Sequence, residues 1–119
     1  MIGKIVTVTV DRKLGTYHPK HKDIYYPINY GFISGITAKD GEEQDVYIMG
    51  INEPVDSFTG EIIAIIHRKD DIEEKWVVAP ENMSFTEEEI IKQTHFQEQY
   101  FDIVIIAEIG RNNRSALQI

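Results

Sequence analysis

The sequence contains no cysteine, no long hydrophobic run and few basic residues. Without cysteine the chain forms neither disulfide bonds nor thiolate metal sites, and a reducing cytoplasm is the compartment we expect. The longest apolar runs, such as residues 103–107, are far shorter than the ~20 residues that cross a bilayer. No basic and apolar leader precedes the first β pattern. We therefore expect a cytoplasmic protein without a membrane partner.

Acidic residues outnumber basic residues by 20 to 12, which gives a formal net charge of −8. Nonspecific binding of nucleic acids depends on clustered lysine and arginine, so we expect no nucleic-acid partner. An acidic chain can still bind a phosphorylated anion when divalent cations neutralise its carboxylates. The length of 119 residues, with 42% hydrophobic and 27% charged residues, is typical of one folded globular domain.

Patterns typical of β-strands fill the first two-thirds of the chain. Val6, Val8 and Val10 alternate with threonines, as in a half-buried strand. Further strands are predicted over residues 25–36, 45–51, 61–68 and 75–79, which are rich in β-branched and aromatic residues. Residues 16–24 lack apolar periodicity and are predicted to form an exposed loop.

A capping-box pattern, Thr86 followed by three glutamates, predicts a helix that begins there and runs to about residue 100. Phe96 falls off its apolar stripe and is a candidate for contact with a second layer or with another copy, which would allow a homo-oligomer. Residues 101–109 are predicted to form a last strand, and residues 110–119 a mobile tail. These patterns favour one α+β, mostly β domain over residues 1–109: a small closed five-stranded OB-like barrel with a C-terminal helix and an additional terminal strand.

Four carboxylates gather at a turn over residues 40–45. Magnesium prefers hard oxygen ligands and retains several waters, so two or three such carboxylates with substrate oxygens would suffice to bind it. The alternative is a solvated hairpin turn. His18 and His21 form a second candidate metal pair, which we interpret as solvated because no strong third ligand is nearby.

Three segments together resemble the soluble family I inorganic pyrophosphatases. They are the Tyr-Pro-Ile-Asn-Tyr-Gly-Phe-Ile stretch at residues 26–33, the acidic turn at residues 40–45, and the acidic turn at residues 70–74 that leads through Lys75 into a strand ending at Pro80. They occur in the family's order, and the similarity extends over about residues 6–100. The resemblance implies hydrolysis of inorganic pyrophosphate to phosphate by a metal-activated water, with Mg²⁺ or alternatively Mn²⁺ as cofactor.

The resemblance also implies a role for each candidate residue. Glu42 would orient or deprotonate the attacking water. The metal ligands would be Asp40, Asp45, one of Asp70 and Asp71, and Glu73, with Asp11 on the metal side of the site. The groups that hold phosphate oxygens would be Lys20, Tyr30, Lys75 and Tyr100.

The sequence departs from the family pattern at several of these positions. Glu42 and Glu73 replace aspartates, Lys22 replaces a glutamate, and Phe101 replaces a lysine. The segment that supplies a phosphate-binding arginine is missing between Lys22 and Tyr26. Because a lysine cannot copy the bidentate fork of arginine, two alternatives stay open. One is hydrolysis of another small diphosphate, and the other is a noncatalytic barrel that binds a phosphorylated metabolite or a partner protein.

Overall fold

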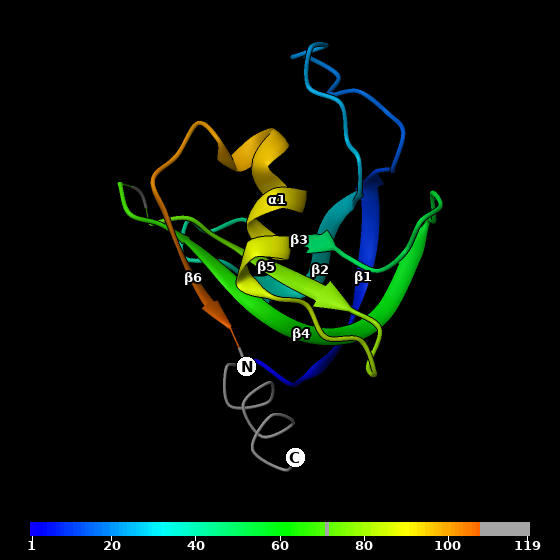
Figure 1. Cartoon of the computed structure of the whole chain (residues 1–119), viewed down its shortest axis with the longest axis vertical. Helices are drawn as coiled ribbons and strands as arrows, with labels where there is room; N and C mark the ends of the chain where they lie inside the picture. The colour runs from blue at the N-terminus through cyan, green and yellow to red at the C-terminus, as the bar shows by residue number, and fades with distance from the viewer. Residues whose placement is uncertain (71, 108–119) are drawn as a thin grey trace.

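The computed structural model describes residues 1–70 and 72–107. They form a closed five-stranded barrel with one helix and one further strand (Figure 1). The elements, in order, are β1 (Ile5–Arg12), β2 (Asn29–Thr37), β3 (Glu43–Ile48), β4 (Ser57–Arg68), β5 (Glu74–Ala79), α1 (Glu87–Glu98) and β6 (Ile103–Ala107). The predicted fold class is confirmed. The predicted tail, residues 110–119, and the last two residues of the predicted final strand lie outside the described residues.

The barrel closes because β4 pairs with β5 along one edge and with β1 along the other. The strand order is β1-β2-β3-β5-β4, and β1 pairs with β4 to complete the ring. The first part of β4 pairs with β1, and its second part pairs with β6. The sequence predicted β4 to begin only at residue 61, which is wrong, because pairing with β1 extends the strand back to Ser57. The strand predicted from residue 25 begins at Asn29, since Tyr25 instead forms an isolated bridge with Tyr17.

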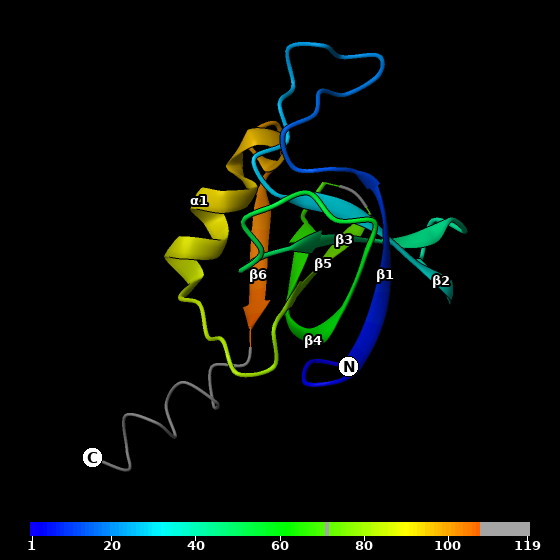
Figure 2. The ribbon, with the colours of Figure 1, turned by 90° about the vertical axis from the view of Figure 1, so that its right-hand side faces the viewer.

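Strands β3 and β5 are buried on both faces, so they support two separate apolar cores. In β3, Val46 and Ile48 point into the barrel, whereas Tyr47 packs under α1. Strand β4 also contributes to both cores. A bulge shifts its register between Ile62, which lies in the barrel core, and Ala64, which lies beneath the helix. The parallel pairing of β3 with β5 agrees with this double burial. The second core fixes α1 against the outside of the barrel (Figure 2).

Helix α1 begins as the sequence predicts. Thr86 Oγ1 accepts from the amide of Glu89, and the Glu89 carboxylate accepts from the amide of Thr86, which completes the capping box. Phe96 lies in the second layer, with its ring 5.2 Å from that of Tyr26 and 5.8 Å from that of Tyr47. Among the described residues, no helix is both long and apolar enough to cross a membrane.

A buried ion pair anchors the C-terminal end of α1 to the sheet. Glu98 is buried and accepts two hydrogen bonds from Arg68 at the end of β4, from Nε at 3.0 Å and from Nη2 at 2.7 Å. The hydroxyl of Tyr47 donates a third, at 2.6 Å. Two parallel bonds between a guanidinium and a carboxylate fix both position and orientation. The helix end is therefore held at one place over the barrel mouth.

We expect Gly31→Ala to destabilise the barrel strongly. A Cβ at Gly31 would lie 1.9 Å from the backbone oxygen of Thr9 on the adjacent strand, so β1 and β2 would have to separate. The expected loss is at least about 3 kcal/mol in the free energy of unfolding, measured by urea denaturation. Gly41→Ala is the control. A Cβ there would meet open space, and the only expected cost is the positive φ of Gly41, about 1 kcal/mol in the free energy of unfolding. Equal losses for the two variants would contradict this close approach.

We expect Glu98→Gln to lower the free energy of unfolding by about 3 kcal/mol, because it leaves the buried guanidinium of Arg68 without its main counter-charge. Glu88→Gln, in the exposed first turn of the same helix, should change stability by less than about 0.5 kcal/mol. Thermal and urea unfolding of both variants measure the difference. A Glu98→Gln protein as stable as the control would show that the ion pair does not anchor the helix.

Candidate functional site

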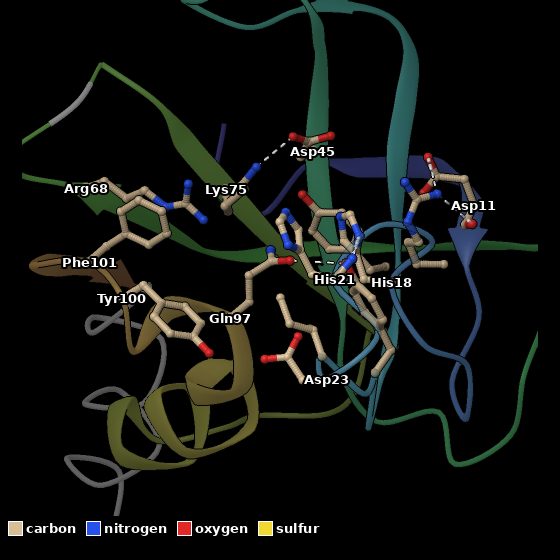
Figure 3. Close-up of a pocket in the computed structure, with 14 residues that line it drawn as sticks. Asp11, His18, His21, Asp23, Asp45, Arg68, Lys75, Gln97, Tyr100 and Phe101 are labelled. Carbon is tan, nitrogen blue, oxygen red and sulfur yellow. Dashed lines mark hydrogen bonds and ion pairs between the residues drawn. The ribbon is translucent and has the colours of Figure 1, made fainter.

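A pocket of about 660 Å³ lies between the mouth of the barrel and the C-terminal end of α1 (Figure 3). Its walls come from the end of β1, the loop between β1 and β2, the starts of β2, β3 and β5, the end of β4 and the segment after α1. The charged residues that line it are Asp11, Asp23, Asp45, Arg12, Arg68 and Lys75. Tyrosines, His18, His21 and Gln97 complete most of the remaining wall. The pocket therefore combines charges of both signs with aromatic rings.

Lys75 lies at the centre of the charges in this pocket. Its ammonium donates to Asp45 Oδ2 and to Glu73 Oε1, each at 2.7 Å. The register of β3 and β5 explains the first contact, because Val46 is paired with Trp76 and the preceding residues therefore lie side by side. Glu73 and Lys75 are two residues apart, so their side chains share a face near the start of β5. Two carboxylates thus converge on one cation.

The lysine remains charged in this environment. Only 5% of its side chain is exposed, and burial alone would lower its pKa, but the contacting carboxylates of Asp45 and Glu73 oppose burial, and the pKa of Lys75 is raised. The Tyr30 ring lies 5.6 Å from the ammonium. Burial raises the pKa of the Tyr30 phenol, which therefore stays protonated at neutral pH. Tyr30 can serve as a hydroxyl donor beside the lysine.

Arg68 forms the other half of the charge cluster. Besides its two bonds to Glu98, its Nη1 donates to both oxygens of Glu73 at 3.3 and 3.4 Å. The guanidinium carbon lies 3.6 Å from the centre of the Phe101 ring, a favourable cation–π geometry. Each of the three guanidinium nitrogens thus donates to a carboxylate. Arg68 contributes a fixed wall to the pocket.

Asp11 faces the pocket from the end of β1. Burial raises the pKa of its carboxyl, and the nearby Asp45 adds to the increase, while Arg12 opposes it. The Arg12 guanidinium approaches the Asp11 carboxylate only at 3.9 Å. A carboxylate with a raised pKa in a polar pocket is a better proton acceptor than an ordinary aspartate.

His18 orders the loop over the pocket. Its Nδ1 accepts hydrogen bonds from the amides of Lys20 and His21, both at 3.0 Å. An imidazole nitrogen that accepts must be unprotonated. Desolvation and the nearby cationic groups lower the pKa of His18, which agrees with this neutral form.

The structure brings some of the predicted site residues together and leaves others apart. Asp11, Asp45, Tyr30, Lys75 and Tyr100 line the pocket, and Glu73 joins them through Lys75. The predicted residues outside the lining are Asp40, Glu42, Asp70 and Lys20, all exposed. Asp71 lies outside the described residues. The roles assigned to these residues stay predictions.

The acidic turn at residues 40–45 therefore contributes only its last carboxylate to the pocket. Asp40 Oδ1 accepts from the amide of Glu42 at 3.0 Å, and Gly41 between them has φ +88°. Such a side-chain bond closes a tight turn and directs the carboxylate to its own backbone. Among the described residues, no three carboxylate or imidazole side chains gather as a preformed metal cage would require.

Sequence reasoning missed the charged residues Arg12, Asp23, Arg68 and Glu98, and also Gln97. A usable signal existed for Glu98: it continues the four-residue spacing of Ile90 and Thr94, so it falls on the buried face of α1. A charged residue in an apolar stripe requires a partner. Arg68 gives a similar signal, because it is a charged residue at the end of the apolar strand β4. The identity of each partner had no signal in the sequence.

Comparison with known proteins identifies the architecture. No family model matches the chain, and no curated protein matches it significantly in sequence. Solved structures do match. An inorganic pyrophosphatase from Ehrlichia chaffeensis has a TM-score of 0.68 at 17% identity, over 90% of this chain and 88% of that one.

Two further inorganic pyrophosphatases match in the same way. The protein from Helicobacter pylori has a TM-score of 0.65 at 14% identity, over 90% of this chain and 86% of that one. The protein from Neisseria gonorrhoeae has a TM-score of 0.60 at 17% identity, over 89% and 81%. The resemblance noted in the sequence is thus confirmed at the level of the fold, and this chain has the fold of the soluble inorganic pyrophosphatases.

Proposed function

We propose that the chain hydrolyses inorganic pyrophosphate, or another small diphosphate, in this pocket with magnesium as cofactor. The observation that carries the proposal is the pair of carboxylates, Asp45 and Glu73, that converge on a single positive charge at the pocket wall. The likeness to pyrophosphatase structures supports it. On the lack of cysteine we place this activity in the cytoplasm.

The charge of the pocket argues that a diphosphate enters together with a divalent cation. Five carboxylates, three in the wall and two just behind it, stand against three basic side chains. With the histidines counted as neutral, the balance is about two negative charges. A free polyanion would be repelled by this surplus. A diphosphate complexed with a divalent cation would bring the compensating charge.

Asp45 and Glu73 suit magnesium in their chemistry. Magnesium takes oxygen ligands and is commonly held by one or two carboxylates together with waters and substrate phosphate oxygens. The side chain of Asp45 lines the pocket and is 37% exposed, and that of Glu73, just behind the wall, is 20% exposed. Neither carboxylate is fully enclosed, so an ion that enters with the ligand could bind at Asp45 and recruit Glu73. Manganese has the same ligand preference and is the alternative.

The remaining polar groups of the wall would hold the phosphate oxygens. Lys75 and Arg12 supply positive charge, and the phenols of Tyr30 and Tyr100 supply hydroxyl donors. A bound divalent cation offsets the charge of the phosphoryl groups and acidifies water. The segment that carries Tyr100 and the loop that carries His18 lie on opposite sides of the pocket (Figure 3), and together they would limit access of bulk water.

We propose that Asp11 accepts the proton of the attacking water. Glu42, which the resemblance assigns to this task, is exposed in the turn and does not line the pocket. Asp11 faces the pocket and has a raised pKa, which suits proton acceptance near neutral pH better than the ordinary value of an aspartate.

A second candidate function is binding without hydrolysis. It is favoured by the ion pairs themselves, because Lys75 already binds both Asp45 and Glu73, and Arg68 already donates to Glu73 and Glu98. In that case the pocket would hold a phosphorylated metabolite and release it unchanged. The two candidates differ in one measurable respect, the release of phosphate.

We expect purified protein to release phosphate from pyrophosphate in the presence of magnesium, and Asp45→Asn to reduce the rate at least about 100-fold because a proposed metal ligand is lost. Asp56→Asn, on a side chain 89% exposed and outside the pocket, is the control and should keep the wild-type rate. Colorimetric phosphate assays over a panel of diphosphates measure both. Calorimetric binding of pyrophosphate without turnover would favour the second candidate, and neither binding nor turnover would reject both.

We expect Asp11→Asn to lower kcat by about 100-fold, since the variant cannot accept a proton, while Glu42→Gln should leave kcat nearly unchanged. The pH profile adds a separate test. Because the pKa of Asp11 is raised, the rate should decline on acidification at a higher pH than an ordinary aspartate would give, and this limb should disappear in Asp11→Asn. If Glu42→Gln lowered kcat more than Asp11→Asn did, the general base would be Glu42 instead.

A further inference from the structure

Lys75 occupies the place between Asp45 and Glu73 that the proposed cofactor would need. Its ammonium lies 2.7 Å from an oxygen of each carboxylate. These are also the two carboxylates that suit magnesium. The lysine and a divalent cation therefore compete for the same oxygens.

We infer that Lys75 is an internal competitor of the divalent cation, and that a phosphate ligand relieves the competition by taking its ammonium. This inference rests on the proposed function, since it concerns the same metal and the same ligand. It names a property that the function alone does not require: the cation and the phosphate bind cooperatively, and each binds weakly without the other.

Because Lys75 is buried, its ammonium must always contact an anion and can only exchange one anionic partner for another. Only 5% of the Lys75 side chain is exposed, so the ammonium cannot give up its carboxylates for water without a large desolvation cost. It leaves them only for another anion. A phosphate group in the pocket supplies that anion, and Asp45 and Glu73 then become available to the metal.

Arg68 cannot make the same exchange. It holds Glu98 with two hydrogen bonds, contacts both oxygens of Glu73 and lies over Phe101. Its release would also detach the end of α1. Of these two buried cations, only Lys75 has a described carboxylate partner in the pocket wall, because Asp45 lines the pocket whereas Glu73 and Glu98 do not.

Linkage makes the coupling reciprocal. If phosphate tightens the binding of the metal by a given factor, the metal must tighten the binding of phosphate by the same factor. Removing the lysine should convert this cooperative pair into a site that binds metal well on its own and gains little from phosphate.

Manganese binding, measured by electron paramagnetic resonance and calorimetry without substrate turnover, tests the inference. Wild-type protein should bind Mn²⁺ alone weakly, and about tenfold more tightly in the presence of inorganic phosphate. Lys75→Gln and Lys75→Met should bind Mn²⁺ alone about tenfold more tightly than wild type and show little further gain with phosphate. Lys39→Gln, whose lysine lies 3.4 Å from Glu74 and outside the pocket lining, is the matched control and should behave as wild type.

Two results would overturn the inference: equal Mn²⁺ affinity in wild type and in both Lys75 variants, or an unchanged effect of phosphate when the lysine is removed. Adding Asp45→Asn to Lys75→Gln should abolish the gained affinity, which ties it to this pocket. Should the Lys75 variants fail to fold, the ¹⁵N signal of the Lys75 ammonium in the wild-type protein decides. It should shift on addition of magnesium with phosphate, and a signal unchanged by that pair would contradict the exchange.

These measurements separate the inference from the proposed function. A protein that hydrolyses pyrophosphate but shows no dependence of Mn²⁺ binding on Lys75 would retain the function and reject the competition. A protein that shows the coupling without phosphate release would retain the competition and reject hydrolysis.

Discussion

The pocket depends on one physical constraint, the neutralisation of buried charge. Lys75 and Arg68 lie largely out of water, and each must face carboxylates, because an unpaired ion in a medium of low dielectric constant would be prohibitively costly. Glu73 contacts both cations and so links the two pairs into one cluster. This cluster sets the floor of the pocket, the charge available to a ligand and the position of the helix end above it.

The packing of helix α1 against the barrel brings the residues of this cluster together. Strands β3 and β5 carry apolar residues on both faces, one set for the barrel core and one for α1. The polar ends of these strands, where Asp45 and Lys75 lie, open at the barrel mouth. Glu98 brings the end of α1 to the same mouth by its bonds to Arg68 and Tyr47. The apolar packing and the ion pairs thus specify the same arrangement.

A shared fold describes the scaffold of this chain, and the side chains of the pocket decide what the pocket can bind. The chain shares its architecture with pyrophosphatases at 14–17% identity, and such a likeness describes the scaffold. The chemistry depends on the side chains this chain places at the mouth. Two of its carboxylates hold a lysine, and the acidic turn at Asp40 bonds to its own backbone. The fold is therefore shared, whereas the charges at the barrel mouth belong to this chain's own residues.

Local patterns in the sequence were sufficient for the barrel class, the strands β1, β3 and β5 and the capping box at Thr86, because alternation and capping are encoded by near neighbours. Tyr30, Lys75 and Asp45, which line the pocket, were named through the family resemblance, and their roles stay predictions. Tertiary structure alone decided which charges meet. Lys75 reaches Asp45 across 30 positions of the chain, and Arg68 likewise reaches Glu98 across 30. Such pairs follow from the register of β3 with β5 and the docking of α1, and a charged residue in sequence looks the same whether it faces water or a buried partner.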